Sequence, residues 1–171
     1  HTAGIFLAHN GVSQSLCCIG FSNTRRTLQD DVLFGQKKIC QSIVELYGRY
    51  SFLFEDDKLS EGDKAFCHRI NAEMDDADAS MAIHYLTKFM YQYYGKNVII
   101  LLDEYDTPMQ EAYINGYWDE LVSFTRNLFN STFKTNPYLA RGIMTGITRV
   151  SKESIFSDLN NPVVVTTTSN M

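Results

Sequence analysis

The residues that end one long apolar run are the strongest candidates for chemistry in this sequence. The run VIILL, residues 98–102, leads directly into Asp103 and Glu104, and Asp106 follows two residues later. An unbroken apolar run of this length is typical of a strand buried on both faces of a parallel sheet. Acids at the end of such a strand project into the crevice where α/β proteins bind ligands. We therefore expect a binding or catalytic site at this strand end.

Nucleotide hydrolysis is the chemistry that the adjacent acids indicate. In P-loop NTPases the first acid of such a pair holds Mg²⁺, and the second orients or deprotonates the attacking water. Asp103 and Glu104 would take these two roles, whereas Asp106 either joins them or caps the turn that follows it. The structural alternative for all three is a solvated loop at a strand end, where acids are common.

A second polar segment follows the next apolar run, at Thr148 and Arg149. A polar side chain at the end of a neighbouring strand would contact the γ-phosphate or the attacking water. Arg149 would also neutralise charge that develops during phosphoryl transfer. The alternative is again an ordinary solvated loop.

A phosphate-binding loop is not found among these motifs. Such a loop has the pattern G-x-x-x-x-G-K-[ST], follows a strand, and binds phosphates through its backbone amides and its lysine. The single Gly-Lys pair, Gly95-Lys96, is followed by Asn97 and precedes a predicted strand, and Met90 replaces the first glycine. The sequence therefore predicts only the acidic half of a nucleotide site.

Alternating strands and helices are predicted to position these residues. Apolar runs predict strands at residues 16–21, 98–102, 142–147 and 163–165. Helical spacing of apolar residues predicts helices at residues 34–50, 79–94 and 117–133, with a shorter one between Ser60 and about residue 71. Gly95 is expected to end the second long helix, and Pro108 falls in a predicted loop. This alternation implies right-handed crossovers and a mainly parallel sheet.

Composition fits one folded domain in a reducing compartment. The chain has 171 residues, 44% of them hydrophobic, and a net charge of −5, which does not favour a polyanionic partner. The acid-rich stretch 55–78 is expected to be a solvated helical excursion. Cys17, Cys18, Cys40 and Cys67 form no CxxC pair, so we expect reduced thiols in a cytoplasmic protein. No stretch approaches the roughly 20 apolar residues that cross a bilayer, so no membrane association is expected.

A longer set of residues resembles the bacterial AAA-ATPase-like family over residues 34–165. The similar segments are Tyr94-Gly95-Lys96, the run from Val98 to Pro108, Gly116-Tyr117, Asn136-Pro137-Tyr138-Leu139 and the stretch from Thr145 to Asn161. The resemblance implies an α/β, three-layer, mainly parallel sheet of the RecA-like P-loop NTPase type. We expect residues 1–171 to be a partial domain of this kind, in which the first strand and the P-loop are absent.

The resemblance also implies roles and partners. Asp103 and Glu104 would be the Walker B pair, and Thr148 or Arg149 would contact nucleotide at the sensor-1 position. ATP and Mg²⁺ are the expected cofactors of the complete domain, and this chain alone is expected to be inactive. The family often carries a PD-(D/E)XK nuclease-like domain, through which alone nucleic acid would become a partner. Because the strand at 142–147 would lie at an open edge without the first strand, we also expect self-association.

Two alternatives to an ATPase remain open from the sequence. A metal-dependent nuclease would use Asp103, Glu104 and Asp106 as Mg²⁺ ligands. These acids crowd one strand end, however, and no lysine stands at the Glu-x-Lys spacing that nucleases of this superfamily use. The other alternative is a non-catalytic module that keeps the fold for interaction with another protein.

Overall fold

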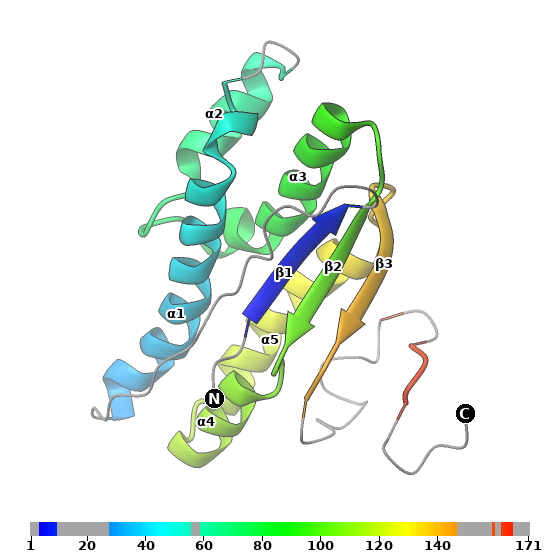
Figure 1. Cartoon of the computed structure of the whole chain (residues 1–171). Coiled ribbons are helices and arrows are strands. Elements are labelled where there is room, and N and C mark those ends of the chain that lie inside the picture. Colours follow the sequence, from blue (N-terminus) through cyan, green and yellow to red (C-terminus); the bar gives the residue numbers. More distant parts are fainter. Residues whose placement is uncertain (1–3, 10–27, 56–58, 147–158, 160–161, 166–171) are drawn as a thin grey trace.

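A computed structural model describes residues 4–9, 28–55, 59–146, 159 and 162–165 of the chain. Within these ranges, three strands and a set of helices follow one another (Figure 1). The strands are β1 (Gly4–His9), β2 (Val98–Asp103) and β3 (Leu139–Met144). The helices are α1 (Leu28–Arg49), η1 (Ser51–Leu53), α2 (Glu61–Arg69), α3 (Asp76–Tyr94), α4 (Thr107–Asn115), α5 (Trp118–Phe129) and the π-helix η2 (Asn130–Lys134).

The described sheet has the order β1-β2-β3, with the acid-bearing strand in the centre. Strands β2 and β3 are parallel, so their carboxyl ends meet at one edge of the sheet (Figure 1). Strand β1 runs antiparallel to β2, with Gly4 opposite Asp103 and His9 opposite Val98. The described strands therefore form a mixed sheet, in which β2 and β3 pair in parallel as predicted and β1 is antiparallel. An antiparallel edge strand is common on α/β sheets, because an edge needs only one partner.

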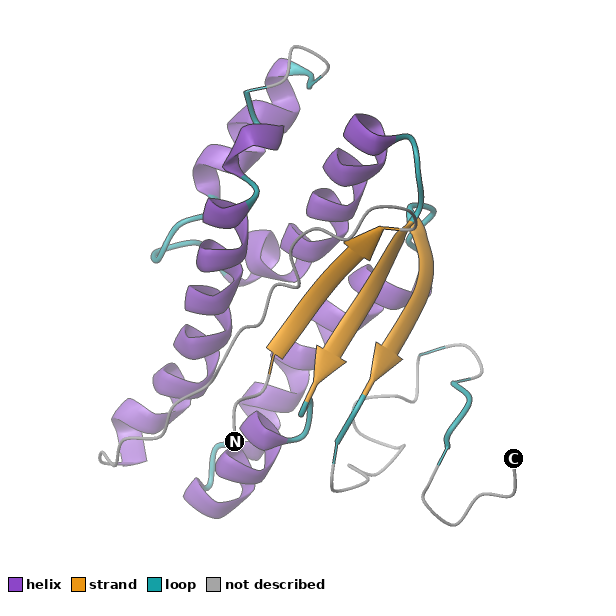
Figure 2. Cartoon of the chain, in the orientation of Figure 1, coloured by secondary structure: helices purple, strands orange, loops and turns teal. Residues whose placement is uncertain are grey.

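One face of β2 packs against helices, whereas the apolar run predicted a strand buried on both faces. Val98, Ile100 and Leu102 are buried, whereas the residues between them are only half-buried. Leu102 and Ile100 lie against Ile83 of α3 and Leu128 of α5. Figure 2 shows the described helices on this one face of the sheet. The described residues thus form two layers, and the three-layer arrangement stays a prediction.

The long helices follow the predicted apolar stripes. In α1 the predicted stripe, Ile39, Ile43, Leu46, Tyr47 and the following Tyr50, is buried throughout. In α5 the predicted Leu121, Phe124 and Leu128 are buried as well. In α3, helical spacing predicts an apolar stripe of Met81, Leu86, Phe89, Met90 and Tyr93, and this prediction is wrong at its end, where Tyr93 is 43% exposed. Its ring packs edge-on against Phe52 at the surface, because the last turn of α3 extends beyond the sheet-facing core.

Local capping sets the helix boundaries near the acid-rich segment. Ser60 caps α2 by accepting a hydrogen bond from the backbone N–H of Asp63, and Gly95 ends α3 with φ +66°. Asp63 is buried, and its Oδ1 accepts a hydrogen bond of 2.6 Å from Lys88 Nζ on α3. The segment is therefore not purely solvated, because this ion pair anchors α2 to α3.

Two other predictions are wrong. The segment around Pro108 is the helix α4 rather than a loop, since proline in a first helical turn has a suitable φ and lacks only an N–H that would be unbonded anyway. Residues 163–165 form no strand, and Val163 is 89% exposed. Their β-branched side chains favour extended backbone, but a strand also needs a pairing partner. The strand predicted at 16–21 lies outside the described residues.

Strand β3 lies at an edge of the described sheet. Most of its residues are exposed, including Ile143 at 44%. This position agrees with the open edge expected for that strand. Among the helices described, none is both long and apolar enough to span a membrane.

Candidate active site

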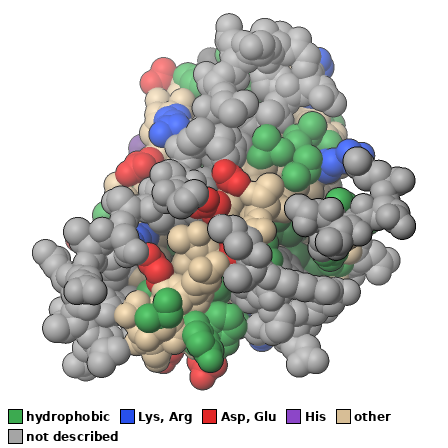
Figure 3. All heavy atoms as spheres, turned by 60° about the horizontal axis from the view of Figure 1, so that its bottom comes forward, with side chains coloured by type: hydrophobic (Ala, Val, Ile, Leu, Met, Phe, Trp, Pro, Cys, Tyr) green, Lys and Arg blue, Asp and Glu red, His purple; other side chains and the backbone are tan. Residues whose placement is uncertain are grey.

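The candidate site lies where the carboxyl ends of β2 and β3 meet. Asp103 is the last residue of β2, and the register pairs Leu102 with Met144, the last residue of β3. Thr145 therefore follows β3 directly across from Asp103. Figure 3 views the molecule from this end and shows acidic side chains near the middle of the face. The strand ends thus present oxygen-bearing side chains together at the surface.

Thr145 joins the two strand ends through four hydrogen bonds. Its hydroxyl donates to Asp103 Oδ1 and accepts from the backbone N–H of Glu104, with an N–O distance of 3.3 Å. Its backbone N–H donates to the carbonyl of Leu102 at 2.9 Å, and its carbonyl accepts from the N–H of Tyr105 at 3.0 Å. A threonine hydroxyl has one donor and two acceptor positions, so both side-chain bonds can form at once.

Glu104 has a backbone conformation that side chains rarely adopt. Its φ is +50°, and it is the only non-glycine residue with a positive φ in the part of the chain that the structure describes. The left-handed region costs an L-residue about 1–2 kcal/mol because Cβ approaches the carbonyl oxygen. Strain of this kind persists where surrounding contacts fix it, and it is frequent at functional sites. The side chain of Glu104 is half-buried beside Asp103.

Asp106 lies deeper than the other acids. It is 1% exposed, and its Oδ2 accepts a hydrogen bond of 2.9 Å from Gln110 in the next turn of α4. It stands at the N-cap position of α4, but its side chain makes no capping hydrogen bond. A Cβ on Gly146 would lie 2.7 Å from Asp106 Oδ1, so only glycine allows the chain after β3 to approach this closely. These contacts support a structural role for Asp106.

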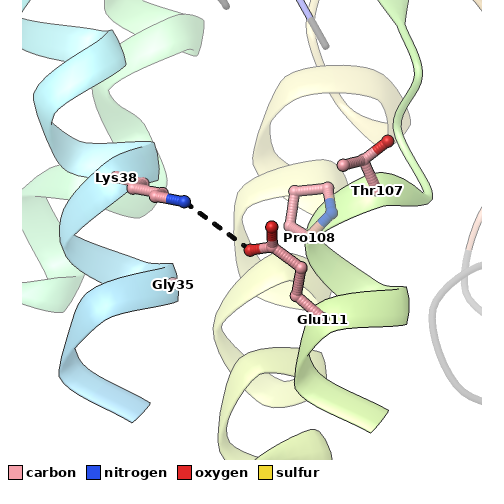
Figure 4. Close-up of a pocket in the computed structure, with 5 residues that line it drawn as sticks. All are labelled: Gly35, Lys38, Thr107, Pro108 and Glu111. Carbon is pink, nitrogen blue, oxygen red and sulfur yellow. Dashed lines mark ion pairs between the residues drawn. The ribbon is translucent and has the colours of Figure 1, made fainter. Parts of the chain in front are cut away.

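The start of α4 also faces α1, beside the acidic loop. Lys38 Nζ on α1 lies 3.7 Å from Glu111 Oε2 on α4, across a hollow that Gly35, Thr107 and Pro108 complete (Figure 4). The hollow has no room for a water molecule, so it is a packed helix contact rather than a ligand site. The Lys38–Glu111 pair thus holds α4, and with it the end of the acidic loop, against α1.

The donor set at the strand ends fits Mg²⁺ bound together with phosphates. Mg²⁺ prefers hard oxygen ligands, and in nucleotide sites it takes one or two carboxylates and keeps several waters. Asp103 supplies a half-buried carboxylate at the surface of the edge. No group of three or more His, Cys, Asp or Glu side chains that could hold a metal occurs within the described ranges.

The structure places only some of the predicted site residues, and their roles stay predictions. It brings Asp103 and Glu104 to the carboxyl edge of the sheet, whereas Thr148 and Arg149 lie outside the described residues. Thr145 was not predicted as a site residue. The signal that could have found it is its place at the end of an apolar run parallel to the acid-bearing strand, because parallel strand ends are neighbours.

Comparison with known proteins gives one match. The family model described as "Predicted AAA-ATPase" matches residues 19–156. No curated protein and no solved structure matches the chain. The matched range contains β2, β3 and the whole of the candidate site.

Proposed function

Since the chain belongs to the AAA-ATPase-like family, we propose that the carboxyl edge of its sheet is the acidic half of an ATP-hydrolysing site. The observation that carries this proposal is the contact between Asp103 and Thr145 at the ends of adjacent parallel strands. Ligands of open α/β sheets bind at this edge, where the side chains after each strand converge.

In the proposed reaction, the chain's acids divide two tasks. Asp103 holds Mg²⁺, which, when bound with ATP, neutralises charge on the phosphate oxygens. Glu104 orients the attacking water and accepts its proton. The adjacency of the two acids suits this division, because Asp103 ends the strand while Glu104 begins the loop in a left-handed backbone conformation. Each carboxylate can then serve a different partner.

Thr148 and Arg149 are the residues after β3 to which we assign roles in the proposed site. They follow Thr145 by a few residues, so the chain can bring them near the same edge. We assign contact with the terminal phosphate or the water to one of them, and neutralisation of developing charge to Arg149. The phosphate-binding motif is not among the 171 residues. The protein at its natural full length is therefore the form to assay.

The test is phosphate release from ATP by the full-length protein, with and without Mg²⁺. We expect Mg²⁺-dependent hydrolysis that Glu104→Gln lowers by about 10²–10⁴-fold in kcat, the usual contribution of a positioned general base. ATP binding by that variant should persist. Asp103→Asn should instead weaken binding of the Mg²⁺ complex.

A matched control is Glu120→Gln, which changes an exposed acid on α5 away from the strand ends. It should leave hydrolysis unchanged. Parallel assays with GTP establish which nucleotide the site takes. Absence of Mg²⁺-dependent hydrolysis, or full activity of Glu104→Gln, would refute the proposal.

A further inference from the structure

Thr145 holds a central place among the contacts at the carboxyl edge. We infer that it is a positioning residue, which orients the carboxylate of Asp103 and fixes the backbone of Glu104. This inference rests on the proposed function and adds to it a residue that acts through both acids. It depends on three separate features: the hydroxyl contacts, the backbone contacts and the left-handed φ of Glu104.

The hydroxyl contacts explain how one side chain can serve both acids. The hydroxyl of Thr145 donates a hydrogen bond to Asp103 Oδ1, which leaves Oδ2 for another ligand. The same hydroxyl accepts the N–H of Glu104. Valine has nearly the same shape as threonine but can form neither bond. A carboxylate without this donor would be free to rotate, and ligands of metals lose affinity when such supporting bonds are removed.

The backbone contacts explain how Glu104 is kept in its conformation. Tyr105, the residue after Glu104, donates its N–H to the carbonyl of Thr145. Leu102, two residues before Glu104, accepts the N–H of Thr145. Thr145 therefore bonds to the chain on both sides of the strained residue. With these points fixed, the direction in which Glu104 leaves the strand is fixed as well.

The position of Thr145 leaves the edge open to a ligand. Thr145 is exposed, and Asp103 and Glu104 are half-buried as whole residues, although Oε2 of Glu104 is itself buried. The support thus comes from the side of β3 and leaves Asp103 partly accessible. A residue that only filled space in the core would be buried, as Leu102 is.

The test compares Thr145→Val, which removes the hydroxyl, with Thr145→Ser, which keeps it, in the full-length protein. We expect Thr145→Val to raise the Mg²⁺ concentration for half-maximal ATP hydrolysis by about 10–100-fold and Thr145→Ser to restore it. A second readout needs no nucleotide. Hydrogen exchange at the Glu104 amide should be faster in Thr145→Val and close to wild type in Thr145→Ser. Thr145→Ala serves as a second hydroxyl-free variant if the valine variant does not fold.

Thr135→Val is the control, since Thr135 is exposed after η2 and makes no contact with the acids. The inference is overturned if Thr145→Val matches wild type in both Mg²⁺ dependence and Glu104 exchange while Glu104→Gln is inactive. It is also overturned if Thr145→Ser behaves like Thr145→Val. If the unmutated protein does not hydrolyse ATP, the proposed function fails, and this inference fails with it.

Discussion

The left-handed conformation of Glu104 makes a sharp prediction about stability. At most positions alanine gives a more stable protein than glycine, because glycine loses more backbone entropy on folding. At position 104 the order should reverse, since φ there is +50°. The comparison of Glu104→Gly with Glu104→Ala isolates this effect. Both variants lack the glutamate side chain, so its contacts cancel in the difference.

The size of the reversal follows from two opposing quantities. Alanine in the left-handed region costs about 1–2 kcal/mol, and glycine in that region costs almost nothing. Against this, glycine gives the unfolded chain extra freedom that is worth about 0.4–1 kcal/mol. The net free energy of unfolding should therefore be greater for Glu104→Gly than for Glu104→Ala, by about 0.5–1 kcal/mol. In a domain of this size that difference corresponds to roughly 1–4 °C in Tm.

The assay is urea unfolding of both variants, with thermal melting as a second measurement. The same pair of substitutions at Glu45 is the control, because Glu45 is an exposed residue inside α1, one turn before the helix ends at Arg49. There alanine should be the more stable variant by about 1 kcal/mol. If alanine is also more stable than glycine at position 104, Glu104 does not hold a strained φ, and the argument from strain fails.

Two further predictions concern contacts around the site and the acid-rich segment. Gly146→Ala should lower the free energy of unfolding by about 1–3 kcal/mol, because its Cβ would lie 2.7 Å from buried Asp106 Oδ1. The control, Gly62→Ala in α2, should not destabilise the protein, because a Cβ there meets nothing closer than 3.8 Å. Equal urea midpoints for the two variants would contradict this prediction. Burial alone would raise the pKa of Asp63, but the hydrogen bonds that it accepts, first from Lys88, outweigh this and lower the pKa below its ordinary value of 3.8. Because the pKa of Asp63 is lower in the folded state, the stabilisation is present above about pH 4 and is lost as the pH falls through the folded-state pKa. In urea unfolding, the difference in free energy of unfolding between wild type and Asp63→Asn should therefore shrink between pH 7 and pH 3. A constant difference would show that the ion pair is not the cause.

The sequence predicted those parts of the fold that depend on local patterns. The run before Asp103 forms the central strand, since a short run of Val, Ile and Leu residues favours extended backbone in a sheet. The stripes of α1 and α5 were predicted because helical spacing places their apolar residues on one side. Ser60 and Gly95 mark helix ends for local reasons: the Ser60 side chain accepts a backbone N–H of the first turn, and Gly95 adopts a left-handed φ without strain. The family resemblance is confirmed over residues 19–156.

Most of the features that were not predicted depend on contacts between distant segments. Thr145 lies beside Asp103 only because β2 and β3 pair in a particular register. The two residues are 42 positions apart in the sequence. The direction of β1 is set by its pairing with β2, and residues 163–165 show that a β-branched run alone does not make a strand. The helix α4 was not predicted for a local reason. Proline is common in loops, but it is also favoured in a first helical turn, which is where Pro108 lies.

The balance of energies at the strand ends explains why a strained glutamate can persist at an exposed edge. The conformation of Glu104 costs about 1–2 kcal/mol. Four hydrogen bonds join Thr145 to the segment from Leu102 to Tyr105, and each ordinary bond contributes about 0.5–1.5 kcal/mol net. The bonds together exceed the strain, so the loop does not relax to an extended strand end. If the strain were relieved by extending β2 for one more residue, Glu104 would point to the opposite face from Asp103, since side chains alternate along a strand. The left-handed turn therefore bears on the proposed function, which requires two consecutive acids to act at one edge of the sheet.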